Sequence, residues 1–122
     1  VLMSYLYNGV PGESIPELAC KAYNVIKPNG LYIVHDFMVE DDRSGPHLAA
    51  LWQLQHLAFT PTAKSITASW VSGIMKKEGF IDIAIDVLIP DMQNLAFDNP
   101  LLLFLSATTV LFLFYQDHSL IY

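Results

Sequence analysis

Short apolar runs alternate with segments of helical periodicity along the first 92 residues of the chain. The apolar run over residues 1–7 ends in Asn-Gly and Pro-Gly pairs, which predicts a strand followed by a turn. Residues 14–27 predict a helix, because Ser14 and Glu17 match a capping box and Lys-Pro-Asn-Gly ends the segment. Its expected apolar stripe is Leu18, Ala22, Val25 and Ile26. Residues 31–35 then read as a strand buried on both faces of a parallel sheet.

The next segments predict two more helices and a last strand. Residues 46–59 form a Leu-rich helical pattern with proline near its first position. Ser65 or Thr67 caps a second helix that runs to Glu78. Its expected buried residues are Trp70, Val71, Ile74 and Met75. Residues 80–92 alternate as in a half-buried or edge strand. One face of this strand would carry Ile81, Ile83, Ile85, Val87 and Ile89. The order strand, helix, strand, helix, helix, strand predicts an α/β domain with a largely parallel sheet.

Composition narrows the classes of function. A chain of 122 residues supports one small domain, and with 53% hydrophobic and 15% charged residues it is too apolar to be disordered. The net charge is −6 and the six basic residues are scattered, which excludes a basic stripe for nucleic acid. The single cysteine, Cys20, allows neither an internal disulfide nor a zinc framework and suits a reducing, cytoplasmic location.

The two ends of the sequence differ in character from the middle. The chain opens inside an apolar run without an initiator Met, which predicts a chain cut within a strand of a longer protein. Residues 93–122 form an apolar tail, in which residues 99–116 contain no charged group over 18 positions. This length sits at the lower limit for a membrane span. The alternatives are a β-hairpin or helix that completes the core, or a carboxyl end altered by splicing or frameshift.

An acidic run, Glu40-Asp41-Asp42, follows the second strand. Three consecutive carboxylates on an extended chain cannot all face one ion, and no histidine or asparagine ligand pattern accompanies them. We therefore expect a solvated turn in which Arg43 pairs locally, and no metal site.

Several segments between Leu2 and Met92 together resemble a known protein family, and this region is about three quarters of the chain. These are LMSYLYNGVPGE, ELACKAYNVIKPNGLYIVHDFMVEDDRSGP, LAALWQLQHLAFTP and SITASWVSGIMKKEGF. In combination they resemble the S-adenosylmethionine-dependent O-methyltransferases, in the branch with plant phenolic, acetylserotonin and bacterial polyketide O-methyltransferases. The match stops after Met92, so the division expected is 1–92, a partial methyltransferase domain, and 93–122, a tail unlike the family.

The resemblance implies a fold and an activity. The fold would be the C-terminal half of a Rossmann-like class I methyltransferase domain, with a mostly parallel sheet and flanking helices. The intact protein would transfer a methyl group from S-adenosylmethionine to a hydroxyl of a small aromatic or polyketide-like molecule, and it would form a homodimer. The glycine-rich loop and the ribose-binding acid of the family's first half are absent here. We therefore expect that the 122 residues alone neither catalyse nor bind S-adenosylhomocysteine.

The resemblance also implies roles for single residues. Tyr7 stands where family members usually have the catalytic histidine, and it could bind substrate although an unshifted tyrosine is a poor base. Asp36 matches the acid that orients that histidine. Ser65 matches a second acid, so two of the three expected acid–base residues are replaced. His35 occupies a usually apolar position and is interpreted as a histidine at the core edge.

The Leu-rich helix corresponds to the family's acceptor-pocket helix. Trp52, Gln53 and Gln55 would line the acceptor side, and His56 is the replacement base that remains. Trp52 and His56 are four residues apart and share a helix face. Two other readings stay open: a truncated, non-catalytic methyltransferase-like protein that pairs with a full-length subunit, and a small membrane-attached α/β protein.

Overall fold

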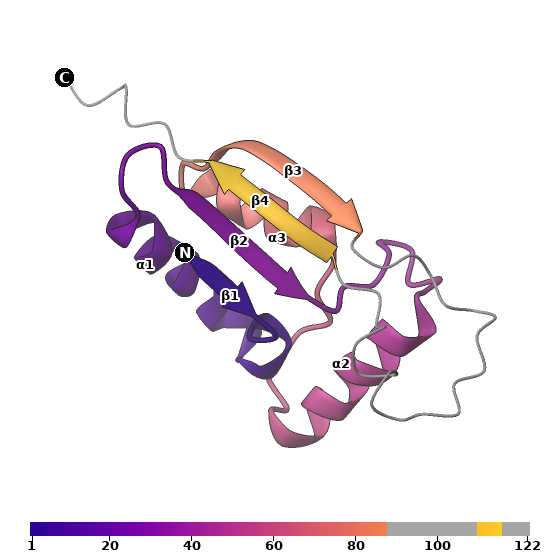
Figure 1. Cartoon of the computed structure of the whole chain (residues 1–122). Helices are drawn as coiled ribbons and strands as arrows, with labels where there is room; N and C mark the ends of the chain where they lie inside the picture. Colours follow the sequence, from indigo (N-terminus) through magenta and orange to yellow (C-terminus); the bar gives the residue numbers. More distant parts are fainter. Residues whose placement is uncertain (88–109, 116–122) are drawn as a thin grey trace, which may run out of the picture.

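The computed structural model describes residues 1–87 and 110–115. In this part of the chain, four strands form one sheet and three α-helices and two short 3-10 turns pack around it (Figure 1). The strands are β1 (Leu2–Ser4), β2 (Leu31–Asp36), β3 (Ile81–Val87) and β4 (Val110–Tyr115). The helices are α1 (Ile15–Val25), α2 (His47–Phe59) and α3 (Ala68–Lys77), and the 3-10 turns are η1 (Tyr7–Gly9) and η2 (Gly12–Ser14).

The strand order in the sheet is β1-β2-β4-β3. β1 pairs parallel to β2, with Leu2 opposite Ile33, and β4 pairs antiparallel to both β2 and β3. Three of the strands therefore run in one direction and β4 runs against them, as Figure 1 shows. The expected α/β class and largely parallel strand direction are confirmed for β1, β2 and β3. The reversed strand β4 comes from the uncharged stretch, and the other tail residues lie outside those described.

The main core lies between one face of the sheet and the helices α1 and α3. Alternate residues of β2, Tyr32 and Val34, are buried against these helices. The helices contribute Ile15, Ala19, Ala22, Val71, Ile74 and Met75 to the same cluster. The opposite face of the sheet is more open, since Leu2 is 63% and Leu31 is 43% exposed. α2 stands apart, beyond the carboxyl ends of β1 and β2 (Figure 1), and packs against η1.

Two local expectations about α1 are wrong. Ser14 precedes the helix, but its side chain makes no capping hydrogen bond. It lies at the end of η2 in a right-handed conformation, with φ −82° and ψ −15°, whereas a capping side chain requires an extended backbone. Val25 is 72% exposed, because the helical period places Ala19, Ala22 and Ile26 on the buried stripe and leaves Val25 beside it.

The alternation in β3 is also interrupted. Asp82 adopts a left-handed backbone with φ 53°, and the pairing with β4 shifts register between Ile81 and Ala84. Of the described isoleucines, Ile83 packs on the core, whereas Ile81 and Ile85 are exposed. The side chain of Val87 and residue Ile89 lie outside the described part of the chain. A bulge of this kind changes which face each side chain meets. None of the helices in the described residues combines the length and apolar character needed to cross a membrane.

Candidate functional site

The carboxyl ends of β1 and β2 bring Asn8 and Asp36 together. Because the two strands are parallel, the turn that follows β1 lies beside the last residue of β2. Asp36 is fully buried and accepts hydrogen bonds from Asn8 Nδ2 at 2.5 Å, from Asn8 N at 3.2 Å and from Phe37 N at 2.8 Å. The strand end is therefore a buried carboxylate site whose hydrogen-bond donors come from its own and the neighbouring segment.

Burial raises the pKa of Asp36 above its ordinary value, and the hydrogen bonds from Phe37 and Asn8 act in the opposite direction. Burial dominates because removing a carboxylate from water penalises its charged form. Asp36 is thus held in place by donors and shielded from solvent. Such a group is suited to orienting a neighbour, which is the role that the resemblance implies for this position.

The side chain of Asn8 is buried, and its two amide hydrogens are used. Asn8 Nδ2 donates to Asp36 and, at 2.8 Å, to the carbonyl oxygen of Phe37. This fixes the orientation of the amide, since the reverse orientation would face its oxygen toward a carboxylate. Asn8 Oδ1 is buried and has no hydrogen-bond partner among the described residues. A buried acceptor without a partner is uncommon, and its partner can be a water molecule or a group that the described residues do not include.

Tyr7, the predicted substrate-binding residue, faces the core. Its side chain is fully buried, and its hydroxyl is 2.7 Å from that of Tyr32, which also donates to Met3 Sδ at 3.0 Å. Burial raises the pKa of both tyrosines, that of Tyr32 to about 12 and that of Tyr7 further. The structure therefore brings the next residue, Asn8, to Asp36. The chain turns tightly in the 3-10 turn after β1, so Asn8 and not Tyr7 reaches Asp36. The Asn-Gly pair in this turn is the feature of the sequence that indicates it.

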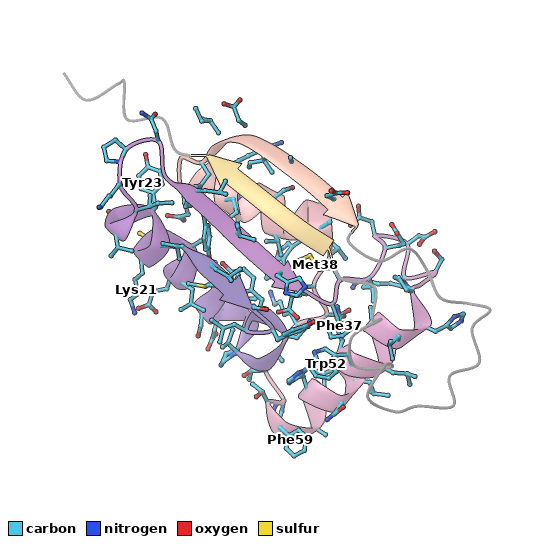
Figure 2. All side chains as sticks on the ribbon, in the orientation of Figure 1. Lys21, Tyr23, Phe37, Met38, Trp52 and Phe59 are labelled. Carbon is cyan, nitrogen blue, oxygen red and sulfur yellow. The ribbon has the colours of Figure 1, made fainter. Side chains whose placement is uncertain are left out.

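An aromatic wall stands beside this edge of the sheet. Trp52 of α2 lies next to Phe37, with ring centroids 4.7 Å apart, and Figure 2 shows Trp52 between α2 and the end of β2. Tyr5 follows β1 with a left-handed φ of 53°, and its ring lies 5.4 Å from Phe37 and 6.2 Å from Trp52. Phe37 is buried beneath the other two rings, so the exposed part of the wall consists of Tyr5 and Trp52, which can contact a planar apolar molecule.

His56 lies at the far end of this wall and faces the turn after β1. Its ring is 5.1 Å from Trp52, and a Cβ added at Gly9 would lie 3.6 Å from its Cε1 and Nδ1 atoms. Thr60 Oγ1 donates to the carbonyl oxygen of Gly9 at 3.1 Å and fixes the end of α2 against the turn. His56 Nε2 is buried without a hydrogen-bond partner among the described residues. The imidazole therefore adjoins the residue that follows Asn8.

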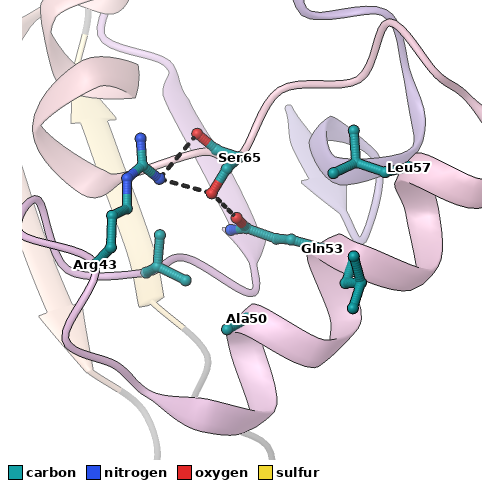
Figure 3. Close-up of a pocket in the computed structure, with 7 residues that line it drawn as sticks. Arg43, Ala50, Gln53, Leu57 and Ser65 are labelled. Carbon is teal, nitrogen blue, oxygen red and sulfur yellow. Dashed lines mark hydrogen bonds between the residues drawn. The ribbon is translucent and has the colours of Figure 1, made fainter.

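The two predicted glutamines of α2 differ in position. Gln53 is buried, and its Nε2 donates to the carbonyl oxygens of Phe37 and Ile66, each at 3.0 Å. Its Oε1 accepts a hydrogen bond from Ser65 Oγ (Figure 3). Gln55 is exposed. The structure thus uses Gln53 to hold α2 against two loops and places Gln55 away from the Asn8–Asp36 pair.

The remaining polar candidates lie outside this cluster. His35 is on the open face of the sheet, 2.7 Å from Ser4 Oγ, and partial burial lowers its pKa. The acidic run is exposed as expected, but Arg43 does not pair with it. Arg43 Nη1 instead donates to Ser65 O at 3.2 Å and to Ser65 Oγ at 2.6 Å. The serine that replaces the family's second acid is therefore joined to Arg43, not to Asp36.

The two glycines before α1 lie in close contact with side chains from other parts of the described structure. A cofactor such as S-adenosylmethionine needs close backbone approach at a glycine turn that opens a helix. The turns before α1 contain Gly9 and Gly12, but a Cβ on Gly12 would collide with the side chain of Lys64, and His56 packs over Gly9. Side chains of this chain already occupy both approaches.

Comparison with known proteins identifies the fold. No protein-family model matches the sequence, and a comparison with curated proteins gives no match either. A candidate O-methyltransferase from Nostoc punctiforme aligns over 95% of this chain and 31% of its own, with a TM-score of 0.74 and 22% identity. Human N-acetylserotonin methyltransferase in complex with S-adenosylmethionine aligns over 95% of this chain and 28% of its own, with a TM-score of 0.70 and 17% identity.

An O-methyltransferase family protein from Burkholderia thailandensis aligns over 98% of this chain and 30% of its own, with a TM-score of 0.69 and 16% identity. The chain thus spans about three tenths of the length of these three proteins. At these identities the likeness concerns the fold. This chain has the fold of part of an S-adenosylmethionine-dependent O-methyltransferase.

Proposed function

We propose that this chain forms the acceptor side of an S-adenosylmethionine-dependent O-methyltransferase that acts on a hydroxyl of a small aromatic or polyketide-like molecule. The fold supports the proposal, and one observation carries it. Two buried atoms have no partner among the described residues: Asn8 Oδ1, and Nε2 of His56, whose ring packs over the adjacent Gly9. Both lie at the sheet edge where parallel α/β folds place their ligands.

The two atoms supply complementary chemistry. Before the reaction, Asn8 Oδ1 can accept the single hydrogen of an acceptor hydroxyl and so orient its oxygen, but a carboxamide cannot take up the proton. For methyl transfer the hydroxyl has to turn the same hydrogen to the imidazole of His56, which takes up the proton as the oxygen is methylated. Asp36 acts through Asn8, since it fixes the amide and is itself enclosed. The aromatic wall would hold the ring that bears the hydroxyl.

S-adenosylmethionine would be the methyl donor. The proposal assigns the binding of this cofactor to other residues and assigns this chain the acceptor site only. As the proposal stands, the 122 residues alone do not transfer methyl groups. A homodimer of the intact protein remains a prediction.

A second candidate is a non-catalytic methyltransferase-like protein. The observation in its favour is Asn8 itself, because the residue that touches the buried acid is one that cannot accept a proton. The two candidates differ in what His56 does to a bound hydroxyl.

The decisive experiment uses 4-nitrophenol, whose phenolate absorbs visible light. The 122-residue chain and its His56→Phe variant are titrated into the probe at constant pH. In the proposed enzyme, the wild-type chain increases the phenolate absorbance saturably and the His56→Phe chain binds the probe without that increase. His47→Phe is the matched control, since His47 is an exposed histidine at the other end of the same helix.

Binding without a His56-dependent increase would favour the non-catalytic candidate, and absence of binding would contradict the acceptor site. A separate calorimetric titration with S-adenosylhomocysteine tests the cofactor statement. We expect no saturable heat from the folded chain. Saturable binding would show that the described turns do hold the cofactor, whatever the result with 4-nitrophenol.

A further inference from the structure

A second concave surface lies between α2 and the loops that precede α2 and α3. It is a groove of about 200 Å³ (Figure 3). Its apolar wall consists of Val39, Ala50, Leu54 and Leu57. Ala50, Leu54 and Leu57 are spaced i, i+4 and i+7 and therefore share one face of α2. Trp52 and His56 lie on another face of the helix, so the groove is separate from the acceptor site.

The polar end of the groove is formed by Arg43 and its partner Ser65. Arg43 Nη1 is fixed by two hydrogen bonds to Ser65, and Ser65 Oγ in turn donates to the buried Gln53. The guanidinium is thus attached through one nitrogen to a network that reaches the core. No hydrogen bond from its Nη2 or Nε is found among the described residues, which leaves donors available at the groove.

The neighbouring acids do not neutralise Arg43 by ion pairing in the described structure. Asp41 accepts a hydrogen bond from Ser69 Oγ, and Asp42 accepts one from Ser44 N at 2.9 Å. Both carboxylates are exposed; the partner of Asp41 lies in α3, and that of Asp42 lies in the same turn. Hydrogen bonds from Ser69 and Thr67, and to a smaller extent the charge of Arg43, lower the pKa of Asp41. The groove therefore combines a held cation with an apolar wall in a chain whose net charge is −6.

We propose that this groove binds a small apolar carboxylate. A guanidinium presents paired N–H donors that match the two oxygens of a carboxylate. An apolar cavity of about 150 Å³ accommodates one benzene ring, so a groove of about 200 Å³ suits a single ring or a short acyl chain. The carboxylate lies on Arg43, and the apolar part lies over Ala50, Leu54 and Leu57. The inference does not depend on the proposed methyl transfer.

The test compares benzoate with benzamide, which has the same shape and no charge. Binding to the 122-residue chain is followed by NMR through the methyl resonances of Leu54 and Leu57. We expect saturable binding of benzoate in the millimolar range, and binding of benzamide at least about tenfold weaker, because the charged hydrogen bonds are lost. Arg43→Gln should weaken benzoate by a similar factor and leave benzamide unchanged.

Two more variants keep the test decisive even if the Arg43→Gln variant does not fold. Ala50→Phe keeps the charge, fills the exposed apolar wall and should abolish binding of both compounds. Lys27→Gln removes an exposed positive charge outside the groove and should leave benzoate binding unchanged. Equal affinity for benzoate and benzamide would overturn the proposal. Benzoate-induced chemical-shift changes confined to residues outside the groove would also overturn it. So would sedimentation data showing that the chain self-associates through the groove and that Ala50→Phe disrupts this association.

Discussion

The side-chain amide of Asn8 and the carboxylate of Asp36 are joined by a 2.5 Å hydrogen bond between segments 28 positions apart in the sequence. The pair links the turn after β1 to the end of β2. Asn8→Ala removes the donor to Asp36 and the donor to the Phe37 carbonyl oxygen. We expect a loss of about 2–4 kcal/mol in the free energy of unfolding, measured with urea, because two buried acceptors lose a partner.

Asn24→Ala is the control for this variant. Asn24 is exposed and donates only a long hydrogen bond of 3.6 Å to Cys20 Sγ. Its replacement should change the free energy of unfolding by less than about 0.5 kcal/mol. Similar values for the two variants would show that the Asn8–Asp36 pair does not stabilise the fold.

Asp36 should give the fold a pH dependence of defined sign. Its pKa is raised in the folded state, so the folded chain keeps a proton that the unfolded chain has released. The free energy of unfolding should therefore be highest below the ordinary Asp pKa of about 4 and should fall as the pH rises through the window up to the raised pKa. Urea unfolding across this range should show the decline, and Asp36→Asn should flatten it.

The exposed Asp42 supplies the contrast. Hydrogen bonds from Ser44 lower its pKa, so its contribution is present above the ordinary Asp pKa and is lost as the pH falls. Asp42→Asn should leave the decline assigned to Asp36 in place. If the decline in the free energy of unfolding persists in Asp36→Asn and disappears in Asp42→Asn, the assignment of this pH dependence to Asp36 is wrong.

Gln53 and Gln55 are two residues apart on α2, but their replacement should affect the free energy of unfolding differently. Gln53→Ala leaves the carbonyl oxygens of Phe37 and Ile66 without their donor, and we expect a loss of about 2–4 kcal/mol in the free energy of unfolding. Gln55→Ala removes an exposed side chain and should change this free energy by less than about 0.5 kcal/mol. Thermal and urea unfolding of the two variants provide the comparison. Equal losses would contradict the role given to Gln53.

Two glycines in and after α3 form another matched pair. Gly79 has a φ of +98°, and a Cβ there would lie 3.2 Å from the Tyr23 ring, so Gly79→Ala should destabilise the fold by about 1–2 kcal/mol. Gly73 lies inside α3, and a Cβ there would meet no atom within 4 Å. Gly73→Ala should therefore stabilise the fold by about 0.5–1 kcal/mol, as helix propensity predicts. Changes of the same sign in both variants would contradict this interpretation.

The spacing of hydrophobic residues predicts the helices and strands of residues 1–87 well, because each of them has a clear apolar pattern. Helix α3, with Val71, Ile74 and Met75, and strand β2, with Tyr32 and Val34, bury the residues that their periods indicate. Period cannot show a backbone irregularity that adds a residue. The bulge at Asp82 is such an irregularity and shifts the register after Ile81. The 3-10 turn that ends at Ser14 is also invisible to the period, and it removes the expected cap.

The candidate site is predicted in part. Asp36 could be placed at the sheet edge because parallel strands end together, and His56 and Trp52 could be placed on one helix face. The choice between Tyr7 and Asn8 depends on how tightly the chain turns after β1, which single-sequence patterns do not define. The structural role of Gln53 depends on its hydrogen bonds to carbonyl groups of two other loops, and these contacts are visible only in three dimensions.

The position of β4 has a consequence for how the chain is made. Because β4 lies between β2 and β3, β3 has no pairing partner in the described sheet until residues 110–115 have left the ribosome. During synthesis β1, β2 and the helices α1 and α3 can associate early, but β3 has to wait with its backbone groups unpaired. Folding of this sheet is therefore completed only after residues 110–115 are synthesised, and a ribosome stalled before Val110 would hold a nascent chain with an open strand that chaperones can bind.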